Sequence, residues 1–155
     1  MGKEIERKFL IKDMPDLSKY EFKRLEQGYL CTDPTIRVRK EDDSYYMTYK
    51  GRGRIEKEEY NLDLTKEAYE TLIAKSEGNI ISKTRYLIPI GKSSKGNDLT
   101  AELDVFDAPF APLRFLEIEF LSMEEANDFI TPDWFGEDVT DNTEYYNSTM
   151  SKKVF

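Results

Sequence analysis

The chain begins MGKEIERKFLIK (residues 1–12), and the interpretation of the remaining sequence depends on this segment. Glu4, Glu6 and Lys8 are spaced two residues apart. Because a β-strand sends alternate side chains to opposite faces, two carboxylates and one ammonium group would lie in a row on one face. Adjacent carboxylates repel each other, and a divalent metal ion with oxygen ligands would relieve that repulsion. A solvent-facing strand shows the same alternation, so the other strands have to distinguish the two interpretations.

Seven further segments have the alternating pattern of β-strands, and short turn sequences rich in Asp, Gly, Pro or Ser separate most of them. With the opening segment, the predicted strands cover residues 1–12, 20–31, 35–41, 45–50, 54–64, 80–90, 98–106 and 114–121. Eight extended segments with short connections are typical of an antiparallel sheet or barrel.

Helical signals occur in three places, and the predicted helices cover residues 66–76, 122–130 and 144–152. Thr65 is a favourable N-cap for the first helix, which Gly78 is expected to end. Ser122 and Glu125 have the spacing of a capping box at the start of the second helix. The sequence therefore predicts a mainly β protein of the α+β class with a few helices packed outside the sheet.

Acidic and basic residues are segregated on the predicted strands. One face of the first and last strands carries Glu4, Glu6, Glu117 and Glu119. The same face of the third, fourth and sixth strands carries Arg37, Arg39, Lys50, Lys83 and Arg85. In a closed barrel these charges would lie inside, where like charges require counter-ions: a metal for the acids and a polyanion for the bases. An open sheet with a charged solvent face fits the same periodicity, and both arrangements stay open at this point.

The composition narrows the possible functions. The 155 residues are enough for one domain, expected to cover residues 1–155, and 39% apolar with 35% charged residues is typical of a globular chain. The chain has no histidine, which excludes histidine-based catalytic triads and makes the usual zinc sites improbable. The net charge of −8 argues against a nucleic-acid partner, although basic residues concentrated in one place can still bind a small anion.

The sequence also leads to an expectation about location. No apolar segment approaches the roughly 20 residues of a membrane-spanning helix, and no apolar leader segment follows the first residues. Cys31 is the single cysteine and cannot form an internal disulfide bond. We therefore expect a cytoplasmic protein without a membrane partner, and the sequence leaves open whether it is a monomer or a homodimer.

The chain resembles the CYTH family, the triphosphate tunnel metalloenzymes. Glu4, Glu6 and Lys8 match the E-x-E-x-K signature of the family. Further blocks follow in the family's order along nearly the whole chain: Gln27–Leu30, Ile36–Arg39, Thr48–Gly51, Glu58–Glu59, Lys83–Tyr86, Glu102–Phe106, Leu116–Phe120, and Val139–Asp141 with Tyr145 and Asn147.

This resemblance implies an eight-stranded antiparallel tunnel with a charged interior, which holds a triphosphate and one or two Mg²⁺ or Mn²⁺ ions. By position, the implied metal ligands are Glu4, Glu6, Glu117 and Glu119. The implied phosphate-binding residues are Lys8, Arg37, Arg39, Lys50, Lys83 and Arg85. The implied catalytic residues are Glu4, Glu6, Lys8 and Lys83, with Glu59 and Asp104 as auxiliary acids. Asp104 and Glu102 could instead be simple ion-pair partners of neighbouring basic residues.

The function implied by the resemblance is a metal-dependent triphosphatase. It would hydrolyse the terminal phosphoanhydride of inorganic tripolyphosphate or a small organic triphosphate and release orthophosphate. Thiamine triphosphatase and a non-catalytic polyphosphate-binding module remain alternatives, whereas the adenylate cyclase branch carries a His-Phe motif that this chain lacks. Asn61 stands where the family often has an acid, which leaves the number of metal ions open.

Overall fold

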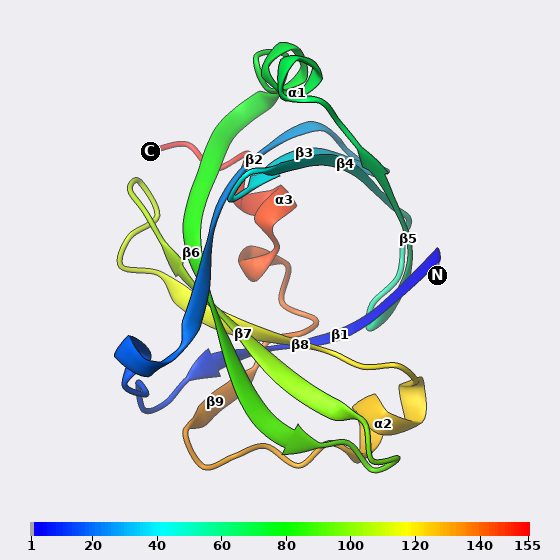
Figure 1. Cartoon of the computed structure of the whole chain (residues 1–155), viewed down its shortest axis with the longest axis vertical. Coiled ribbons are helices and arrows are strands. Elements are labelled where there is room, and N and C mark those ends of the chain that lie inside the picture. The colour runs from blue at the N-terminus through cyan, green and yellow to red at the C-terminus, as the bar shows by residue number, and fades with distance from the viewer. Residues whose placement is uncertain (1) are drawn as a thin grey trace.

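We describe a computed structural model of residues 2–155; Met1, at the start of the first predicted strand, lies outside the described residues. Nine strands form one antiparallel sheet in the order β5-β4-β3-β2-β6-β7-β8-β1-β9 (Figure 1). The strands are β1 (Gly2–Ile11), β2 (Glu21–Thr32), β3 (Thr35–Glu41), β4 (Ser44–Lys50), β5 (Glu56–Asp63), β6 (Glu77–Lys92), β7 (Asp98–Phe106), β8 (Arg114–Glu119) and β9 (Phe135–Asp138).

The sheet closes into a barrel because β1 pairs with two strands. Its first part, Gly2–Ile5, pairs with β5, and its second part, Glu6–Phe9, pairs with β8. The predicted eight-stranded antiparallel barrel of the α+β, mainly β, class is therefore confirmed. β9 is an additional strand beside the end of β1. It was missed because its four residues, Phe135–Asp138, have no alternating pattern.

The outer face of β1, β7 and β8 is apolar and forms the main core. Phe9, Leu103, Leu116 and Ile118 are almost completely buried there. Ala126 of α2 (Met123–Asp128) and Phe135 of β9 pack against this face. Because the apolar side chains of these strands face outward into this core, their charged side chains face into the barrel.

The first predicted helix is correct at its start and wrong at its end. α1 (Lys66–Ile73) begins after Thr65, whose side chain accepts a hydrogen bond from the Ala68 backbone, and ends at Ala74 rather than residue 76. Gly78 does not cap it: this glycine lies in β6, with φ +73°, against the backbone of Ser151. The position still requires glycine, for two reasons: its φ is positive, and the backbone of Ser151 leaves no room for a Cβ atom.

The capping box of α2 is confirmed, because Ser122 accepts a hydrogen bond from the backbone of Glu125. The third predicted helix is wrong as a continuous helix. The chain forms η2 (Thr143–Tyr145) and α3 (Asn147–Met150), interrupted at Tyr146, whose ψ of 130° is extended. A further short helix, η1 (Leu17–Lys19), joins β1 to β2. Among residues 2–155, no helix is long and apolar enough to cross a membrane.

The C-terminal segment, residues 139–155, also corrects the expectation that every helix packs outside the barrel. In Figure 1, η2 and α3 lie within the outline of the ring of strands. Met150 and Tyr145 pack against an inner cluster at one end of the barrel, which includes Tyr29, Ile81 and Phe115. One end of the barrel interior is thus apolar and holds the C-terminal segment, and the charged cavity lies beyond it.

Four strand ends differ by two or more residues from the sequence-based prediction. β6 is the longest strand and begins at Glu77 and ends at Lys92, beyond both predicted ends; β5 begins at Glu56, two residues later; and β8 ends at Glu119, two residues earlier. Boundaries of this kind depend on where a partner strand is available for pairing, which local sequence does not specify.

Candidate active site

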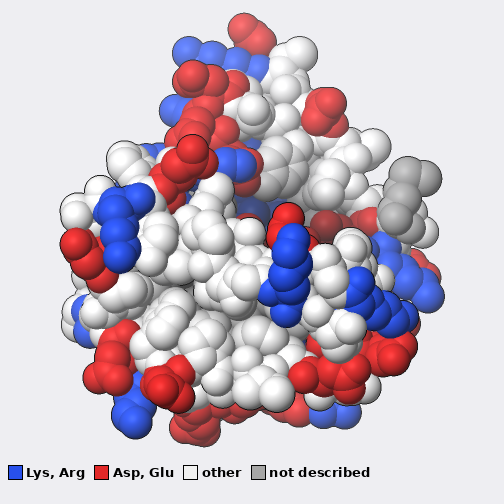
Figure 2. Space-filling model, turned by 60° about the horizontal axis from the view of Figure 1, so that its bottom comes forward, with Lys and Arg blue, Asp and Glu red and all other residues white. Residues whose placement is uncertain are grey.

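A cavity of about 440 Å³ occupies the barrel interior, and most of its lining side chains are charged. Of the predicted site residues it is lined by Glu4, Glu6, Lys8, Arg37, Arg39, Lys50, Glu59, Lys83, Arg85, Glu117 and Glu119. The arrangement with inward charges is therefore confirmed over the open sheet with a solvent face. Figure 2 shows a hollow in the surface with acidic and basic side chains in its depth.

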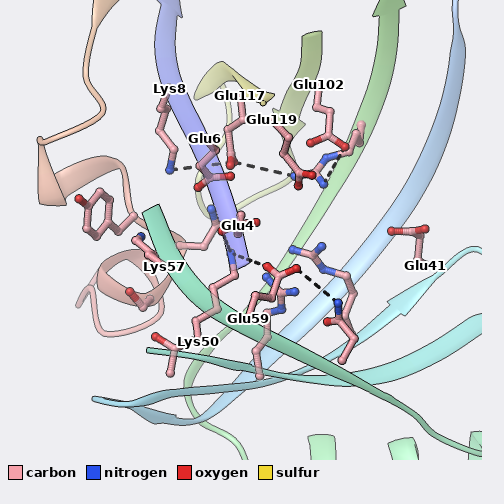
Figure 3. Close-up of a pocket in the computed structure, with 18 of the residues that line it drawn as sticks. Glu4, Glu6, Lys8, Glu41, Lys50, Lys57, Glu59, Glu102, Glu117 and Glu119 are labelled. Carbon is pink, nitrogen blue, oxygen red and sulfur yellow. Dashed lines mark hydrogen bonds and ion pairs between the residues drawn. The ribbon is translucent and has the colours of Figure 1, made fainter. Parts of the chain in front are cut away.

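Three carboxylates gather on β1 and β8. Oxygen atoms of Glu4, Glu6 and Glu119 all lie within 4.8 Å of one another. The strand register explains this proximity, because Glu6 lies directly opposite Glu119 and Glu4 shares the inward face of β1. Figure 3 shows Glu6, Glu117 and Glu119 close together beside β1. The opening Glu-x-Glu pattern thus points into the cavity.

Electrostatics in this acidic cluster favour an additional cation. Burial raises the pKa of Glu6 well above its usual range, and the neighbouring carboxylates Glu117 and Glu4 raise it further. Partial desolvation, with Glu102 and Glu4 nearby, raises the pKa of Glu119 to about 7. Burial opposes ionisation of Glu4 as well, but Lys50, 2.8 Å away, lowers its pKa. Two of these three carboxylates therefore lack a compensating positive charge.

Glu117 has surroundings that distinguish it from the other three predicted metal ligands. Its Oε1 lies 4.0 Å from Lys8 Nζ and 3.9 Å from Arg85 Nη2. Although burial opposes ionisation, these two cations hold the pKa of Glu117 well below its usual range. Glu117 thus links the acidic cluster to the basic half of the cavity (Figure 3).

Arg37 and Arg39 on β3 and Lys83 and Arg85 on β6 line the opposite wall, whereas Lys8 and Lys50 come from β1 and β4. Arg37 donates from Nη2 to Thr48, whose hydroxyl donates in turn to Asn61. The Nε of Arg37 is buried and has no acceptor among residues 2–155. Since a buried donor without a partner costs about 1–3 kcal/mol, this unpaired Nε is a local cost of holding Arg37 in the cavity wall.

Asp104, one of the predicted catalytic acids, lies beneath this wall and does not line the cavity. It is completely buried, with Lys83 Nζ at 2.8 Å and Arg85 Nε at 2.8 Å. Burial opposes its ionisation, but Arg85 and Lys83 lower its pKa. Burial also lowers the pKa of Lys83 to about 7, although Asp104 opposes that change. In this position Asp104 is a counter-ion that holds two cations beside the cavity.

The sequence resemblance includes Tyr145 and Asn147 of the C-terminal segment, but it gave these two residues no role in the site. Lys8 donates to the backbone carbonyl of Tyr145, and Lys83 donates to the side chain of Asn147. The ring of Tyr146 lies 5.4 Å from Lys8 Nζ and 4.8 Å from Lys57 Nζ. Lys57 also lines the cavity, because it lies on the same inward face of β5 as Glu59. No local pattern in residues 139–155 signals that they reach these lysines.

The profile of the CYTH domain matches residues 2–153 of the chain. This chain belongs to the CYTH family. The curated relatives include an inorganic triphosphatase of Nitrosomonas europaea, 39% identical over 155 aligned residues that cover 97% of this chain and 98% of that protein. An inorganic triphosphatase of Acetivibrio thermocellus is 33% identical, and the alignment covers 100% of this chain and 97% of that protein.

Solved structures also resemble this CYTH protein. The crystal structure of the inorganic triphosphatase NE1496 superimposes with a TM-score of 0.68 at 38% identity, over 99% of this chain and 97% of that chain. A conserved hypothetical protein from Pyrococcus furiosus has a TM-score of 0.54 at 19% identity, over 81% of this chain and 83% of that chain. At that identity the second likeness concerns the fold alone.

Proposed function

We propose that this CYTH protein is a metal-dependent triphosphatase that hydrolyses inorganic tripolyphosphate at its terminal phosphoanhydride. The observation that carries the proposal is the division of one cavity into two halves. One half holds the carboxylates of Glu4, Glu6 and Glu119, and the other holds the buried guanidinium groups of Arg37 and Arg39. Two curated relatives that align over nearly their whole length are inorganic triphosphatases, which supports this choice of substrate.

The acidic half fits a hard divalent cation such as Mg²⁺ or Mn²⁺. The donor set of Glu4, Glu6 and Glu119 consists of carboxylate oxygens, which these ions prefer. Glu4 Oε1 already lies 2.8 Å from Lys50 Nζ, so a bound ion would share this carboxylate with Lys50. We assign these residues, with Glu117 beside them, to hold one or two ions. A bound ion would neutralise charge on the phosphoryl oxygens and polarise the scissile bond.

The basic half binds and orients the phosphate chain. We assign phosphate oxygens to Lys8, Arg37, Arg39, Lys50, Lys83 and Arg85, all of which line the cavity. Arginine presents a planar fork to two oxygens, whereas lysine supplies a compact charge. Because phosphoryl transfer depends mainly on positioning and charge neutralisation, this wall can act without histidine.

Hydrolysis requires a water molecule at the terminal phosphorus. Its attack forms a new P–O bond and breaks the bond to the bridging oxygen, which gives orthophosphate and pyrophosphate. We assign Glu59 as the general base that accepts a proton from this water, because it lines the cavity and burial raises its pKa. Asp104 acts indirectly, by holding Lys83 and Arg85 in place.

The deciding experiment is phosphate release from a panel of tripolyphosphate, thiamine triphosphate, ATP and longer polyphosphate, compared by kcat/KM. We expect the highest kcat/KM for tripolyphosphate with Mg²⁺ or Mn²⁺ and no turnover in EDTA. Turnover that persists in EDTA would contradict the metal role. Tight binding of tripolyphosphate without any phosphate release would instead identify a polyphosphate-binding module.

A further inference from the structure

Gln27 lies on the inner face of β2, behind the cavity lining, and is completely buried. Its side-chain oxygen accepts a hydrogen bond from Arg39 Nε at 2.8 Å. Its side-chain nitrogen donates to Asn147 Oδ1 at 3.1 Å and to Tyr29 Oη at 3.4 Å. Both ends of the amide therefore make hydrogen bonds. The oxygen end contacts Arg39 directly, and the nitrogen end contacts Asn147, which in turn contacts Lys83.

The first contact sets the orientation of Arg39. With Nε directed at Gln27 and Nη1 donating to Tyr46 Oη at 3.3 Å, the guanidinium plane is held at two of its nitrogens. Nη2 has no partner among residues 2–155 and remains available to a ligand in the cavity that Arg39 lines. A guanidinium held in this way loses little conformational entropy when an oxyanion binds.

The second contact sets the orientation of the Asn147 amide. Asn147 Oδ1 accepts from Gln27 Nε2 and from Lys83 Nζ, each at 3.1 Å. Since only the oxygen end of an amide can accept, the Gln27 donor keeps that end turned toward Lys83. Lys83 is then held between Asn147 and Asp104, which lies 2.8 Å away on its other side.

We propose that Gln27 is a positioning residue for phosphate binding, which acts directly on Arg39 and through Asn147 on Lys83. This inference rests on the proposed function, because Arg39 and Lys83 are there assigned to phosphate oxygens. Gln27 itself does not line the cavity. Glutamine suits the position because it supplies one acceptor and two donors without adding a charge beneath Arg39 and Lys83.

The test compares Gln27→Met, which keeps the side-chain volume and removes both hydrogen-bonding ends, with Gln27→Glu, which keeps an acceptor for Arg39 and removes the donor to Asn147. Hydrogen bonds to charged groups contribute enough that we expect Gln27→Met to lower kcat/KM for tripolyphosphate about 30-fold, mostly through KM. Gln27→Glu should lower kcat/KM less than Gln27→Met does, because it disturbs only the hydrogen bond to Asn147 and, through it, the position of Lys83.

Ile81→Val is the matched control, because Ile81 lies opposite Gln27 across β2 and β6 and is equally buried but makes no polar contact. It should lower the melting temperature and leave KM within twofold of wild type.

A second comparison repeats Gln27→Met in an Arg39→Met background. If Gln27 acts through Arg39, Gln27→Met should lower kcat/KM only roughly threefold in the Arg39→Met background. That remaining loss is the part transmitted through Asn147 to Lys83. An undiminished loss would show a merely structural role and overturn the proposal.

The NMR signal of the Arg39 Nε–H group provides a readout that does not need turnover. It should be protected from exchange in wild type and Gln27→Glu, and should lose protection in Gln27→Met. Equal protection in all three proteins would overturn the proposal. Failure of wild type to release phosphate from tripolyphosphate would overturn the proposed function alone, because the Arg39 signal and its response to added tripolyphosphate remain measurable.

Discussion

At the scale of single residues, Arg37 is the side chain on which the proposed phosphate site can be tested most directly. Its guanidinium is buried, yet Nε has no acceptor among residues 2–155. Arg37 Nη2 is held by Thr48, so the side chain cannot easily turn toward another partner. We expect a phosphate oxygen to bind the part of this guanidinium that lines the cavity.

Arg37→Lys should therefore raise KM for tripolyphosphate by roughly tenfold, with a smaller change in kcat, because lysine keeps the charge but loses the planar fork. Steady-state kinetics measure the effect. Arg52→Lys is the control, since Arg52 is exposed and paired with Asp33 outside the cavity, and its KM should not change. Equal KM values for wild type, Arg37→Lys and Arg52→Lys would contradict the assignment of Arg37 to the phosphate site.

Glu6→Gln should lower activity on the order of 100-fold, because it removes one anionic ligand from the acidic cluster. The metal-free variant should melt at or above the wild-type temperature, since burial and neighbouring carboxylates disfavour the charge that the substitution removes. Phosphate release with Mg²⁺ measures the loss of activity, and thermal melting in EDTA measures the stability of the metal-free variant. Glu124→Gln, an exposed residue paired with Lys95, is the control. A fully active Glu6→Gln protein would contradict the assignment.

At the scale of elements, the C-terminal segment is attached to the start of β6. Asn79 donates from its backbone to Ser151 and from its side chain to the carbonyls of Met150 and Lys153. A Cβ atom on Gly78 would overlap the carbonyl oxygen of Ser151. This attachment holds Asn147 and Tyr145 at their contacts with Lys83 and Lys8, so a position outside the cavity supports the site.

Gly78→Ala should detach the C-terminal segment and lower the free energy of unfolding by about 2–3 kcal/mol, from the positive φ and the overlap together. Limited proteolysis should then cleave near the C-terminus, and KM should rise. Gly91→Ala separates the two causes, because Gly91 has φ +99° but no atom within 4 Å of the added methyl group. It should cost about 1 kcal/mol and leave the segment protected. Identical behaviour of the two variants would show that the attachment is unimportant.

At the scale of the whole molecule, the acidic cluster couples stability to pH and to metal. In the folded protein the pKa of Glu119 is raised from 4.5 to about 7, so the folded state binds more protons than the unfolded state between these values. The metal-free protein should consequently lose stability as pH rises from about 4.5 to about 7. Glu4 and Glu117 have lowered pKa values and are ionised in both states over most of this window.

Because a divalent ion binds deprotonated carboxylates, the increase in melting temperature caused by Mg²⁺ should be small at pH 5 and large at pH 8. Thermal melting across this range, with and without Mg²⁺, measures it. Glu119→Gln should flatten the pH dependence, since it removes a titrating group. A Mg²⁺ effect of equal size at both pH values would contradict the predicted coupling.

Several features of fold and site could be predicted from local pattern. The period of two in β1, β3 and β8 indicates that Glu4, Arg37 and Glu119 share the inward face. The place of Asp104 could not be predicted in this way, because its parity on β7 also fits a cavity-lining acid. Its burial under Lys83 and Arg85 depends on the pairing of β6 with β7. Asn147 matches the family, but its contact with Lys83 could not be predicted, since it joins residues 64 positions apart.

By itself, the sequence determined the strands, their antiparallel class and the face on which each charge lies, because alternation along a strand is a local property. Only the tertiary structure decided that the sheet closes through β1 and β5, that Asp104 is a counter-ion, and that η2 and α3 enter the barrel. These outcomes depend on contacts between distant parts of the chain, which are set by strand register and by the requirement that buried charges find partners. The opening Glu-x-Glu pattern thus supplied the side chains, and the closed barrel brought Glu119 to them.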